Sequence, residues 1–436
     1  MTTLVTGATG VVGAPLVRAL LERGDELRIL VRPNSDVEVL PDMDMDILEG
    51  DVTDREDVVE AVKGCERVFH LAGLFEDTAE RESAFFDVNV GGTVNIMQAA
   101  LDHGVQKVVV VSSASTIGEG RGEIGTEETE HRGYFLSPYE RSKWEAEQFV
   151  AEFVEKGVPA VIVNPSLVYG PGNSEHNRGR LTGLLNGVIT ASVDAPAAYV
   201  FVNDLIKGIL AADEIGRPGE RYLLSGTNTT RIEFLRTAAA IAGVDPTLRV
   251  AAPWQLKFFL WIEAFRGRFS KRAPLLTRSA VESALHGASY DSAKAENEFG
   301  LKFIALEEGL DQTIEWLYQE GKIDLPDDVL PNGDHASSDA DTGVVDDDRW
   351  EVVEVEGDEP LPDDDDEWEW EEEEEGTESE KIVAEADEDG WEWVEAGDDK
   401  PSPEDDDEWE WEGVDDDEED SSPEPDDADR NGSRGR

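Results

Sequence analysis

The segment TLVTGATGVVG, Thr3 to Gly13, places three glycines directly after a short run of β-prone residues. Gly7 allows a sharp turn, Gly10 lets a pyrophosphate approach the backbone, and Gly13 lets a following helix pack on the strand. The first N–H groups of that helix, at Val11 and Val12 and beyond, lack partners within the helix and can face phosphates. The segment therefore predicts a strand, turn and helix start that bind a dinucleotide, although such glycines also occur where a loop and a helix merely pack closely.

The charge of the 436-residue chain is distributed unevenly. Residues 1–330 carry 52 acidic and 31 basic side chains, whereas residues 331–436 carry 49 and 6. We therefore expect the folded part to end near Pro326. Residues 1–330 contain ten lysines against twenty-one arginines, a balance that resembles that of a protein from a high-salt cytoplasm. The net charge of −64 argues against nucleic acid as a partner.

Cysteine and hydropathy patterns bear on the compartment. Cys65 is the only cysteine, so no internal disulfide can form, and a small buried side chain is the expected role. The expected first strand leaves no room for a signal peptide before it, and no apolar stretch approaches the ~18 to 20 residues of a membrane-spanning helix. We expect a cytoplasmic protein without a transmembrane segment.

Strand-like and helix-like segments alternate after the glycine-rich turn. The expected strands are 26–31, 45–49, 66–71 and 107–111, and the expected helices are 12–22 and 84–103. This alternation predicts an α/β Rossmann fold with a doubly wound parallel sheet. We expect an NAD(P)-binding core over residues 1–163 and a smaller, mostly helical substrate region over residues 164–330, interleaved with the core sheet.

Residues at the carboxyl ends of these strands are candidates for cofactor binding, because ligands bind there in such sheets. Arg32 stands where an acidic residue would bind the ribose hydroxyls of NAD, and a guanidinium suits the 2′-phosphate of NADP. NADP is therefore favoured, with NAD as the alternative if Arg32 is only a surface residue. The other candidates are Asp51 and Val52 at the adenine end, and Ala72 and Gly73 beside the glycine turn.

The segment SPYERSK, Ser137 to Lys143, has the features of a catalytic helix start. Ser137 and Glu140 form a capping box, and Pro138 suits the first helical position. Tyr139 and Lys143 then lie one turn apart on one face, where an ammonium favours the phenolate and makes the phenol a usable acid and base. The same pair also occurs on solvated helices, but Ser113 ends a neighbouring strand at the ligand-binding edge and favours the catalytic interpretation.

Several motifs together resemble the extended short-chain dehydrogenase/reductase family, also called the NAD-dependent epimerase/dehydratase family. They extend over about residues 3–322: TGATGVVG, HLAG (70–73), VNVGGT (88–93), VSS (111–113), Tyr139 with Lys143, NPSLVYGPG (164–172), FVNDLIKG (201–208) and YDSAKAENEFG (290–300). The resemblance implies Tyr139 as acid/base, Lys143 as its partner and anchor for the nicotinamide ribose, and Ser113 as donor to the substrate oxygen. It also implies that Asn89 helps to hold the cofactor site together and that His70 is structural.

The chain departs from the family pattern at two places. Asn164 stands where many members have an arginine, and Asn203 with Asp204 stands where a valine-aspartate pair is more usual. Neither departure touches Ser113, Tyr139 or Lys143, so they leave the substrate open rather than the chemistry.

Three segments of the C-terminal half carry further expectations. Arg178 and Arg180 could bind a phosphate or diphosphate, or could be solvated. Residues 254–265, WQLKFFLWIEAF, are apolar nearly all round, which favours burial over contact with an apolar substrate or a membrane surface. Residues 306–318 have the apolar spacing of a core helix.

The tail, residues 331–436, contains an internal duplication. Trp350, Pro360, Trp368 and Trp370 recur 41 residues later, as Trp391, Pro401, Trp409 and Trp411. This acidic composition cannot bury a core, so we expect a disordered tail that is either solvated or binds a partner through its tryptophans.

Three functions remain open. The favoured one is a reductase or dehydrogenase that transfers hydride at a carbon bearing oxygen on a small molecule, as Arg32 and the apolar segment 254–265 suggest. A nucleotide-sugar epimerase or dehydratase would use the same triad, as Arg178 and Arg180 suggest, and a non-catalytic NADP-binding protein would use the tail to recruit partners. In the resembling family two long helices, here 84–103 and 137–156, pair between subunits, so a homodimer is expected.

Overall fold

The computed structural model describes residues 2–75, 81–172, 181–244, 248–256, 258, 260, 277–326, 382–387 and 390–395. The chain divides into two units, Met1–Ser338 and Asp339–Arg436. Within the described residues, no helix is long and apolar enough to cross a membrane.

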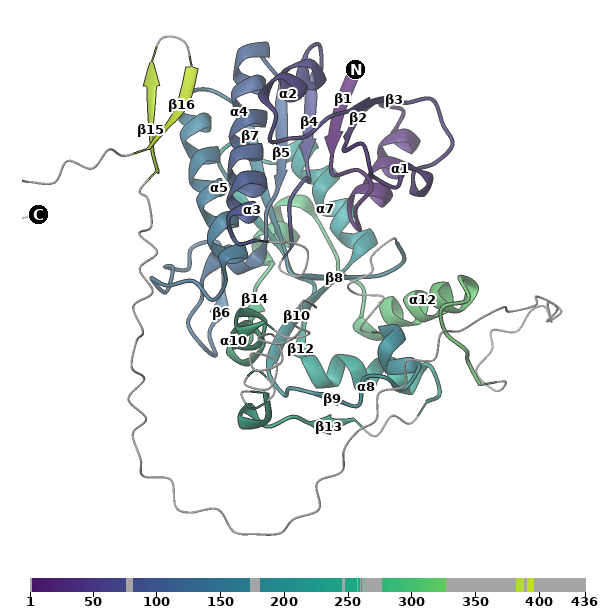
Figure 1. The fold of residues 1–436 in the computed structure, drawn as a ribbon. Coiled ribbons are helices and arrows are strands. Elements are labelled where there is room, and N and C mark those ends of the chain that lie inside the picture. Colours follow the sequence, from purple (N-terminus) through teal and green to yellow (C-terminus); the bar gives the residue numbers. More distant parts are fainter. Residues whose placement is uncertain are drawn as a thin grey trace, which may run out of the picture. The chain divides into compact units, whose positions relative to one another are not determined.

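A seven-stranded sheet forms the centre of the first unit, in the order β11-β7-β5-β4-β1-β2-β3 (Figure 1). Its strands pair in parallel throughout. They are β1 Thr2–Thr6, β2 Glu26–Val31, β3 Asp46–Glu49, β4 Arg67–His70, β5 Lys107–Val111, β7 Ala160–Pro165 and β11 Arg221–Leu224. The strand order reverses between β1 and β4, which is where a doubly wound sheet leaves a crevice at its carboxyl edge. The predicted Rossmann architecture is confirmed.

Helices cover both faces of the sheet, because its strands are apolar on both sides. Val108 and Val110 of β5 pack with α2, α4 and α5, whereas Val109 and Val111 pack with α1, α7 and α11. Successive strand residues point to opposite faces, so one strand serves two cores. The helices are α1 Gly13–Arg23, α2 Arg55–Val62, α4 Gly92–His103, α5 Pro138–Glu155, α7 Val202–Ile215 and α11 Ala293–Phe299.

The helix expected over residues 84–103 is not regular. It begins as α3, Ser83–Phe85, continues as a π-helical segment, Phe86–Gly91, and becomes α4 from Gly92. Such wide turns are frequent at functional sites, and this one contains the buried Asn89.

The C-terminal region adds a second, smaller sheet to its helices. Its strands are β8 Leu167–Tyr169, β10 Pro196–Phe201 and β12 Thr227–Thr230, in the order β12-β10-β8. Residues of α8, Arg231–Ile241, and of α12, Leu306–Gln319, share its apolar core. The expected terminal helix is therefore present, and β11 returns the chain to the main sheet beside β7. The small sheet lies outside what the sequence pattern indicated.

Short elements connect the two regions. The strand β14, Ser289–Tyr290, pairs in parallel with β6, Ile124–Gly125, so the C-terminal region contacts the loop that follows β5. The remaining elements are η1 Val37–Val39, η3 Ala114–Ile117, β9 Ala191–Ser192, β13 Arg249–Val250 and α10 Arg278–His286.

In the second unit the structure describes one antiparallel hairpin, β15 Ile382–Asp387 with β16 Gly390–Glu395. The sequence analysis expected no strands in this tail. The other residues of the predicted duplication lie outside the described residues.

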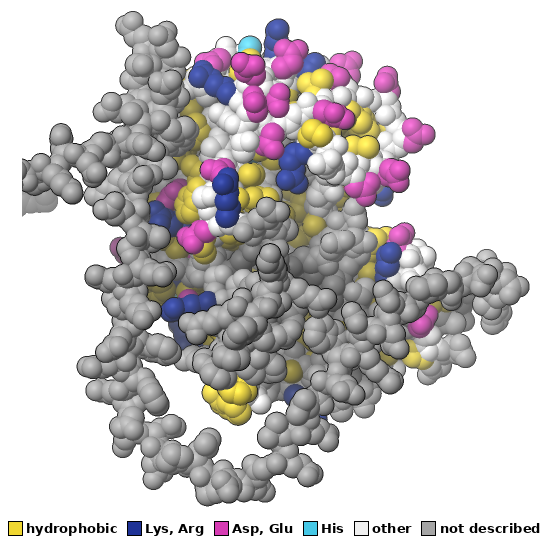
Figure 2. Space-filling model, in the orientation of Figure 1, with side chains coloured by type: hydrophobic (Ala, Val, Ile, Leu, Met, Phe, Trp, Pro, Cys, Tyr) yellow, Lys and Arg dark blue, Asp and Glu magenta, His cyan; other side chains and the backbone are white. Residues whose placement is uncertain are grey.

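The described surface is acidic with interspersed cations. Figure 2 shows Asp and Glu side chains scattered among fewer Lys and Arg side chains on the visible face. This agrees with the acid excess of residues 1–330.

Candidate active site

The glycine-rich turn has the geometry that the sequence predicted. Gly7 has φ 70°, and a Cβ there would lie 2.7 Å from Ala72 N. A Cβ on Gly13 would overlap the carbonyl oxygen of Gly7, whereas one on Gly10 would meet only that oxygen, at 3.2 Å. The turn is thus closely packed at Gly7 and Gly13 and open at the exposed Gly10. This is the cradle that a pyrophosphate needs.

The start of α1 completes this cradle. Val12 precedes the helix without a side-chain cap, and the first turn carries no acidic residue. Its N–H dipoles therefore favour an anion. Gly172, from the turn after β8, approaches the same place, because a Cβ on it would lie 3.5 Å from Val11 O.

Ala72 and Gly73 lie between the glycine turn and helix α5. A Cβ on Gly73 would lie 3.0 Å from Asn89 Oδ1 and 3.5 Å from Lys143 Nζ. A side chain at Gly73 would therefore crowd Asn89 and Lys143.

Asn89 holds this segment in place with its own side chain. Its Oδ1 accepts the Leu74 N–H at 2.8 Å, and its Nδ2 donates to Leu74 O at 3.2 Å and to Ser142 Oγ at 2.9 Å. The Ser142 hydroxyl in turn donates to Tyr139 O at 2.8 Å. These contacts make Asn89 a clamp between the loop after β4 and helix α5, although it was predicted among the cofactor-binding residues.

Lys143 lies beneath the crevice. Its Nζ donates to Val111 O at 3.0 Å, which places the ammonium at the carboxyl end of β5. Burial lowers the pKa of Lys143 to about 8, opposed by the charge of Glu147 one turn along α5. The lysine is therefore largely charged at neutral pH yet able to release a proton.

Tyr139 lies in the first turn of α5 among aromatic side chains. The rings of Phe75 and Phe85 each have centroids 6.2 Å from the Tyr139 ring. Phe85 is buried, whereas Phe75 is 58% exposed. The sequence analysis did not identify these two side chains, because their proximity arises only when the loop after β4 and helix α3 meet α5.

Ser113 ends β5 and caps the short helix η3. Its Oγ lies 2.9 Å from Ser115 Oγ and accepts the Ser115 N–H at 3.3 Å. Ser115 was not predicted, and it can hold the Ser113 hydroxyl in one orientation.

His70 is structural, as the resemblance implied. Its Nδ1 lies 2.8 Å from Thr6 Oγ1 and its Nε2 lies 3.1 Å from Thr93 Oγ1. Thr93 donates to Asn89 O and Thr6 accepts the Ala72 N–H, so the consistent tautomer is neutral with its proton on Nε2. Burial, with a further effect of Lys143, lowers the pKa of His70 to about 3.

The predicted adenosine end lies at the edge formed by β2 and β3. Gly50 N donates to Val31 O at 2.9 Å, which brings Arg32 and Asp51 to adjacent strand ends. Asp51 Oδ1 accepts from Thr53 N and Thr53 Oγ1, both at 2.9 Å, and Val52 packs beneath Gly92. Arg32 is exposed, and no described residue forms an ion pair with its guanidinium.

A buried acidic network lies beneath Ser113. Glu147 Oε1 accepts from Thr116 Oγ1 at 2.8 Å and from Asn164 Nδ2 at 2.6 Å. Glu147 Oε2 pairs with Arg221 Nη1 at 3.3 Å. Arg221, on β11, supplies the positive charge beside Glu147. The neutral Asn164 side chain, which stands where many family members have an arginine, supplies only a hydrogen bond to the same carboxylate. The unusual Asn164 thus belongs to the support of the site.

Two expectations concern segments that the structure describes only in part. Arg178 and Arg180 lie outside the described residues. Burial was favoured for residues 254–265, but the two described aromatic side chains, Trp254 and Phe258, are 67% and 53% exposed. The burial interpretation is therefore wrong for these two side chains.

The chain is similar to known proteins of one family. The family model described as NAD dependent epimerase/dehydratase matches residues 3–224. A sterol demethylase protein B of Methylococcus capsulatus is 32% identical over 334 residues, which are 74% of this chain and 100% of the relative. A 3 beta-hydroxysteroid dehydrogenase/Delta 5→4-isomerase of Mycobacterium tuberculosis is 32% identical over 68% of this chain and 85% of the relative.

Solved structures show the same fold. The crystal structure of gox2253 has a TM-score of 0.66 and 32% identity, and the match covers 74% of this chain and 99% of that one. These matches agree with the closely packed glycine turn and with the position of Lys143 at the carboxyl end of β5. The chain belongs to the NAD-dependent epimerase/dehydratase family and is an NAD(P)-dependent oxidoreductase.

Proposed function

We propose that the protein is an NADP-dependent reductase or dehydrogenase that interconverts a hydroxyl and a carbonyl on an apolar, ring-containing substrate. The observation that carries this proposal is the aromatic surrounding of Tyr139, in which the half-exposed Phe75 offers an apolar face beside the Tyr139 ring. Such a face suits a carbocycle better than a nucleotide-sugar, whose hydroxyls would need polar partners. The names of relatives, a sterol demethylase protein, a 3 beta-hydroxysteroid dehydrogenase and a putative dihydroflavonol 4-reductase of Synechocystis, point the same way.

In this proposal, separate residues of the site bind the cofactor and transfer the proton. Gly7, Gly10 and Gly13 with the start of α1 bind the pyrophosphate, and Lys143 binds the nicotinamide ribose. The bound cofactor supplies or accepts a hydride at the substrate carbon. Tyr139 gives a proton to the substrate oxygen in reduction and takes it back in oxidation. The Lys143 ammonium stabilises the phenolate, and Ser113 donates a hydrogen bond to the same oxygen.

A cofactor-oxidation assay tests the proposal. Purified protein is mixed with NADPH and, in turn, a 3-ketosteroid, decalone and a UDP-sugar, and the loss of NADPH absorbance is followed. We expect turnover with the cyclic ketones and none with the UDP-sugar. Tightly retained cofactor after purification, with interconversion of the UDP-sugar, would instead identify an epimerase.

The NADP preference rests on Arg32. Arg32→Asp replaces a partner of the 2′-phosphate with an acceptor for the ribose hydroxyls, so the ratio of NADP to NAD affinity should fall by about tenfold or more, the size of one lost charge-assisted hydrogen bond. Fluorescence titration with NADPH and NADH measures this ratio. Arg18→Ala, on the exposed side of α1, is the matched control. An unchanged ratio in Arg32→Asp would remove the assignment.

The homodimer proposal rests on helices α4 and α5, which lie side by side on one face of the sheet (Figure 1). We expect light scattering in high salt to give twice the chain mass at micromolar concentration. A mass of one chain under the same conditions would contradict the proposal.

A further inference from the structure

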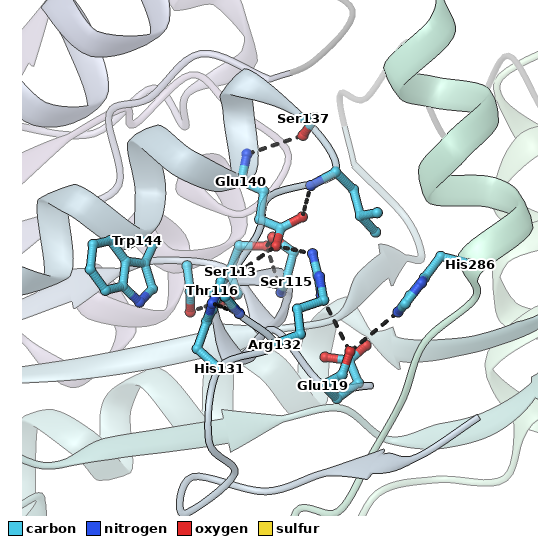
Figure 3. A network of polar contacts seen from close by, with 12 residues as sticks. Ser113, Ser115, Thr116, Glu119, His131, Arg132, Ser137, Glu140, Trp144 and His286 are labelled. Carbon is cyan, nitrogen blue, oxygen red and sulfur yellow. Dashed lines mark hydrogen bonds and ion pairs between the residues drawn. The ribbon is translucent and has the colours of Figure 1, made fainter. Parts of the chain in front are cut away.

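A second group of buried charges lies beside the start of helix α5. It contains Glu119 and Arg132 from the loop after β5, and Glu140 from the first turn of α5 (Figure 3). The side chains of Glu140 and Arg132 are only 3% and 6% exposed, and Glu119 is 2% exposed. Charges are rarely buried this far without a role or a partner.

Glu140 holds the segment that enters the helix. Its Oε1 pairs with Arg132 Nη2, and its Oε2 accepts the Leu136 N–H at 3.1 Å. Ser137 Oγ accepts the Glu140 N–H at 3.1 Å, which is one half of the predicted capping box. The other half differs from the prediction, because the Glu140 carboxylate reaches Leu136 rather than the N–H of Ser137.

These contacts fix the turn that carries Tyr139. On one side of Tyr139, the carboxylate of the next residue is anchored to Arg132 and Leu136. On the other side, Ser142 binds the Tyr139 carbonyl oxygen and connects it to Asn89. A displacement of about 1 Å at such a position can cost ~10²-fold in rate.

The same group continues into the C-terminal region. Arg132 Nη1 donates to Glu119 O at 3.4 Å, and His286 Nε2, from the end of α10, lies 3.2 Å from the same oxygen. The buried Tyr290 side chain of β14 interacts electrostatically with the Glu119 carboxyl, which adds to the effect of burial in raising the pKa of Tyr290. Figure 3 shows His286 pointing at Glu119 from its own helix. The charged group therefore joins the C-terminal region to the start of α5.

The group holds more acid than base. The Glu140 carboxylate pairs with the Arg132 guanidinium, whereas Glu119 contacts Arg132 through its backbone oxygen, so its buried carboxyl adds a second acid beside one base. His131, with Nε2 3.9 Å from Glu140 Oε1, accepts the Gly133 N–H at Nδ1. Burial raises the pKa of Glu140 to about 7, opposed by Arg132 and by the Leu136 N–H and reinforced by Glu119. Burial also raises the pKa of Glu119 and of Tyr290 and lowers the pKa of His131 and of His286.

We propose that Glu140, anchored by Arg132, is a positioning residue for Tyr139, and that protonation of Glu140 weakens this anchor and slows proton transfer at Tyr139. The inference rests on the proposed function, because it needs Tyr139 to be the acid and base. A neutral carboxyl no longer attracts Arg132 as an ion, and one of its oxygens becomes a donor. The first turn of α5 is then held less firmly.

The pH dependence of turnover tests the proposal, with NADPH and a 3-ketosteroid. The wild-type kcat should fall as the pH drops through about 7. Glu140→Gln keeps the shape without the charge, so its kcat should be about five- to tenfold lower at pH 8 and lack this acid limb, with the KM for NADPH within twofold. Glu145→Gln is the control, because Glu145 lies on the same helix and, among the described residues, forms an ion pair only with the exposed Arg141. A Glu140→Gln protein that keeps the wild-type limb and rate overturns the proposal.

Two further variants separate positioning from general damage. Arg132→Met should lower kcat by a similar factor, and the double variant should be no slower than either single variant, because both changes remove one contact. Multiplied effects in the double variant would contradict a shared role. Glu140→Asp, which keeps the charge, should restore an acid limb.

A stability measurement separates this inference from the proposed function. A group whose folded pKa is raised stabilises the protein fully below its ordinary pKa and loses that contribution as the pH rises through the folded value, here about 7. The melting temperature of wild type relative to Glu140→Gln should therefore fall between pH 5 and pH 8. His131 and His286 titrate with the opposite sign but are present in both proteins. If no substrate were turned over, the proposed function would be rejected. If instead the difference in melting temperature did not change with pH, the proposed titration of the buried Glu140 carboxyl would be rejected, whatever the function of the protein.

Discussion

Tyr139→Phe is expected to lower kcat by ~10²- to 10⁴-fold, the usual contribution of a positioned acid and base. The hydroxyl that moves the proton is lost, while the ring keeps its places beside Phe75 and Phe85. The affinity for NADPH should therefore stay within a few-fold of wild type. Steady-state kinetics with a 3-ketosteroid and fluorescence titration with NADPH measure the two quantities.

A neighbouring tyrosine provides the control for this variant. Tyr134 is 55% exposed, and its ring lies 5.3 Å from the Arg132 guanidinium carbon. Tyr134→Phe keeps that ring contact and should retain nearly full turnover. Wild-type turnover in Tyr139→Phe would rule out Tyr139 as the acid and base, whatever the substrate.

The central fold was predictable because its signals are local. The strand of residues 107–111 is almost wholly apolar, as a strand with helices on both faces must be, and the expected bounds coincide with β5. Glycine at Gly24 and at Gly104 ends α1 and α4 in the left-handed conformation, which the sequence marks directly. The π-helical turn around Asn89 left no such mark, because its spacing of apolar residues differs little from that of a regular helix.

The site was predictable where one element carries the chemistry. Tyr139 and Lys143 share one helical face, so their spacing alone indicated their proximity. The contact between Ser115 and Ser113 is also local, because the two residues are only two positions apart in the chain, so it could have been predicted from the sequence. Glu147, one turn beyond Lys143, was visible on the same face, but nothing in the sequence showed that it would be buried.

The remaining contacts arise from tertiary structure. Glu147 meets Arg221 only because β11 joins the sheet beside β7. Glu119 meets Tyr290 only because β14 pairs with β6. In each pair the partners are separated by more than seventy positions in the chain, so no periodicity of the sequence relates them. Sequence reasoning therefore placed the proposed reacting groups near one another but did not find the residues that hold them.

Gly13→Ala is expected to impair both cofactor binding and folding. The new Cβ would overlap the Gly7 carbonyl oxygen and lie 2.7 Å from the Ala8 carbonyl carbon, and both are backbone atoms that can move only with the turn. Overpacking of this kind typically costs about 1 to 3 kcal/mol, and the distorted turn no longer presents its N–H groups to the pyrophosphate. We expect a lower melting temperature and an NADPH affinity reduced by at least about tenfold.

Two alanine variants isolate the cause of that effect. Gly10→Ala adds a Cβ that meets only Gly7 O, at 3.2 Å, so it should melt close to wild type while binding NADPH more weakly, because the methyl group occupies the open side of the cradle. Gly91→Ala adds a Cβ that would lie 3.9 Å from Phe86 O, an ordinary contact distance, and should change neither quantity. Thermal melting and NADPH fluorescence titration of the three variants give the comparison. If Gly10→Ala bound NADPH as tightly as Gly91→Ala, the pyrophosphate would have to lie elsewhere, and the loss of stability in Gly13→Ala would then reflect packing alone.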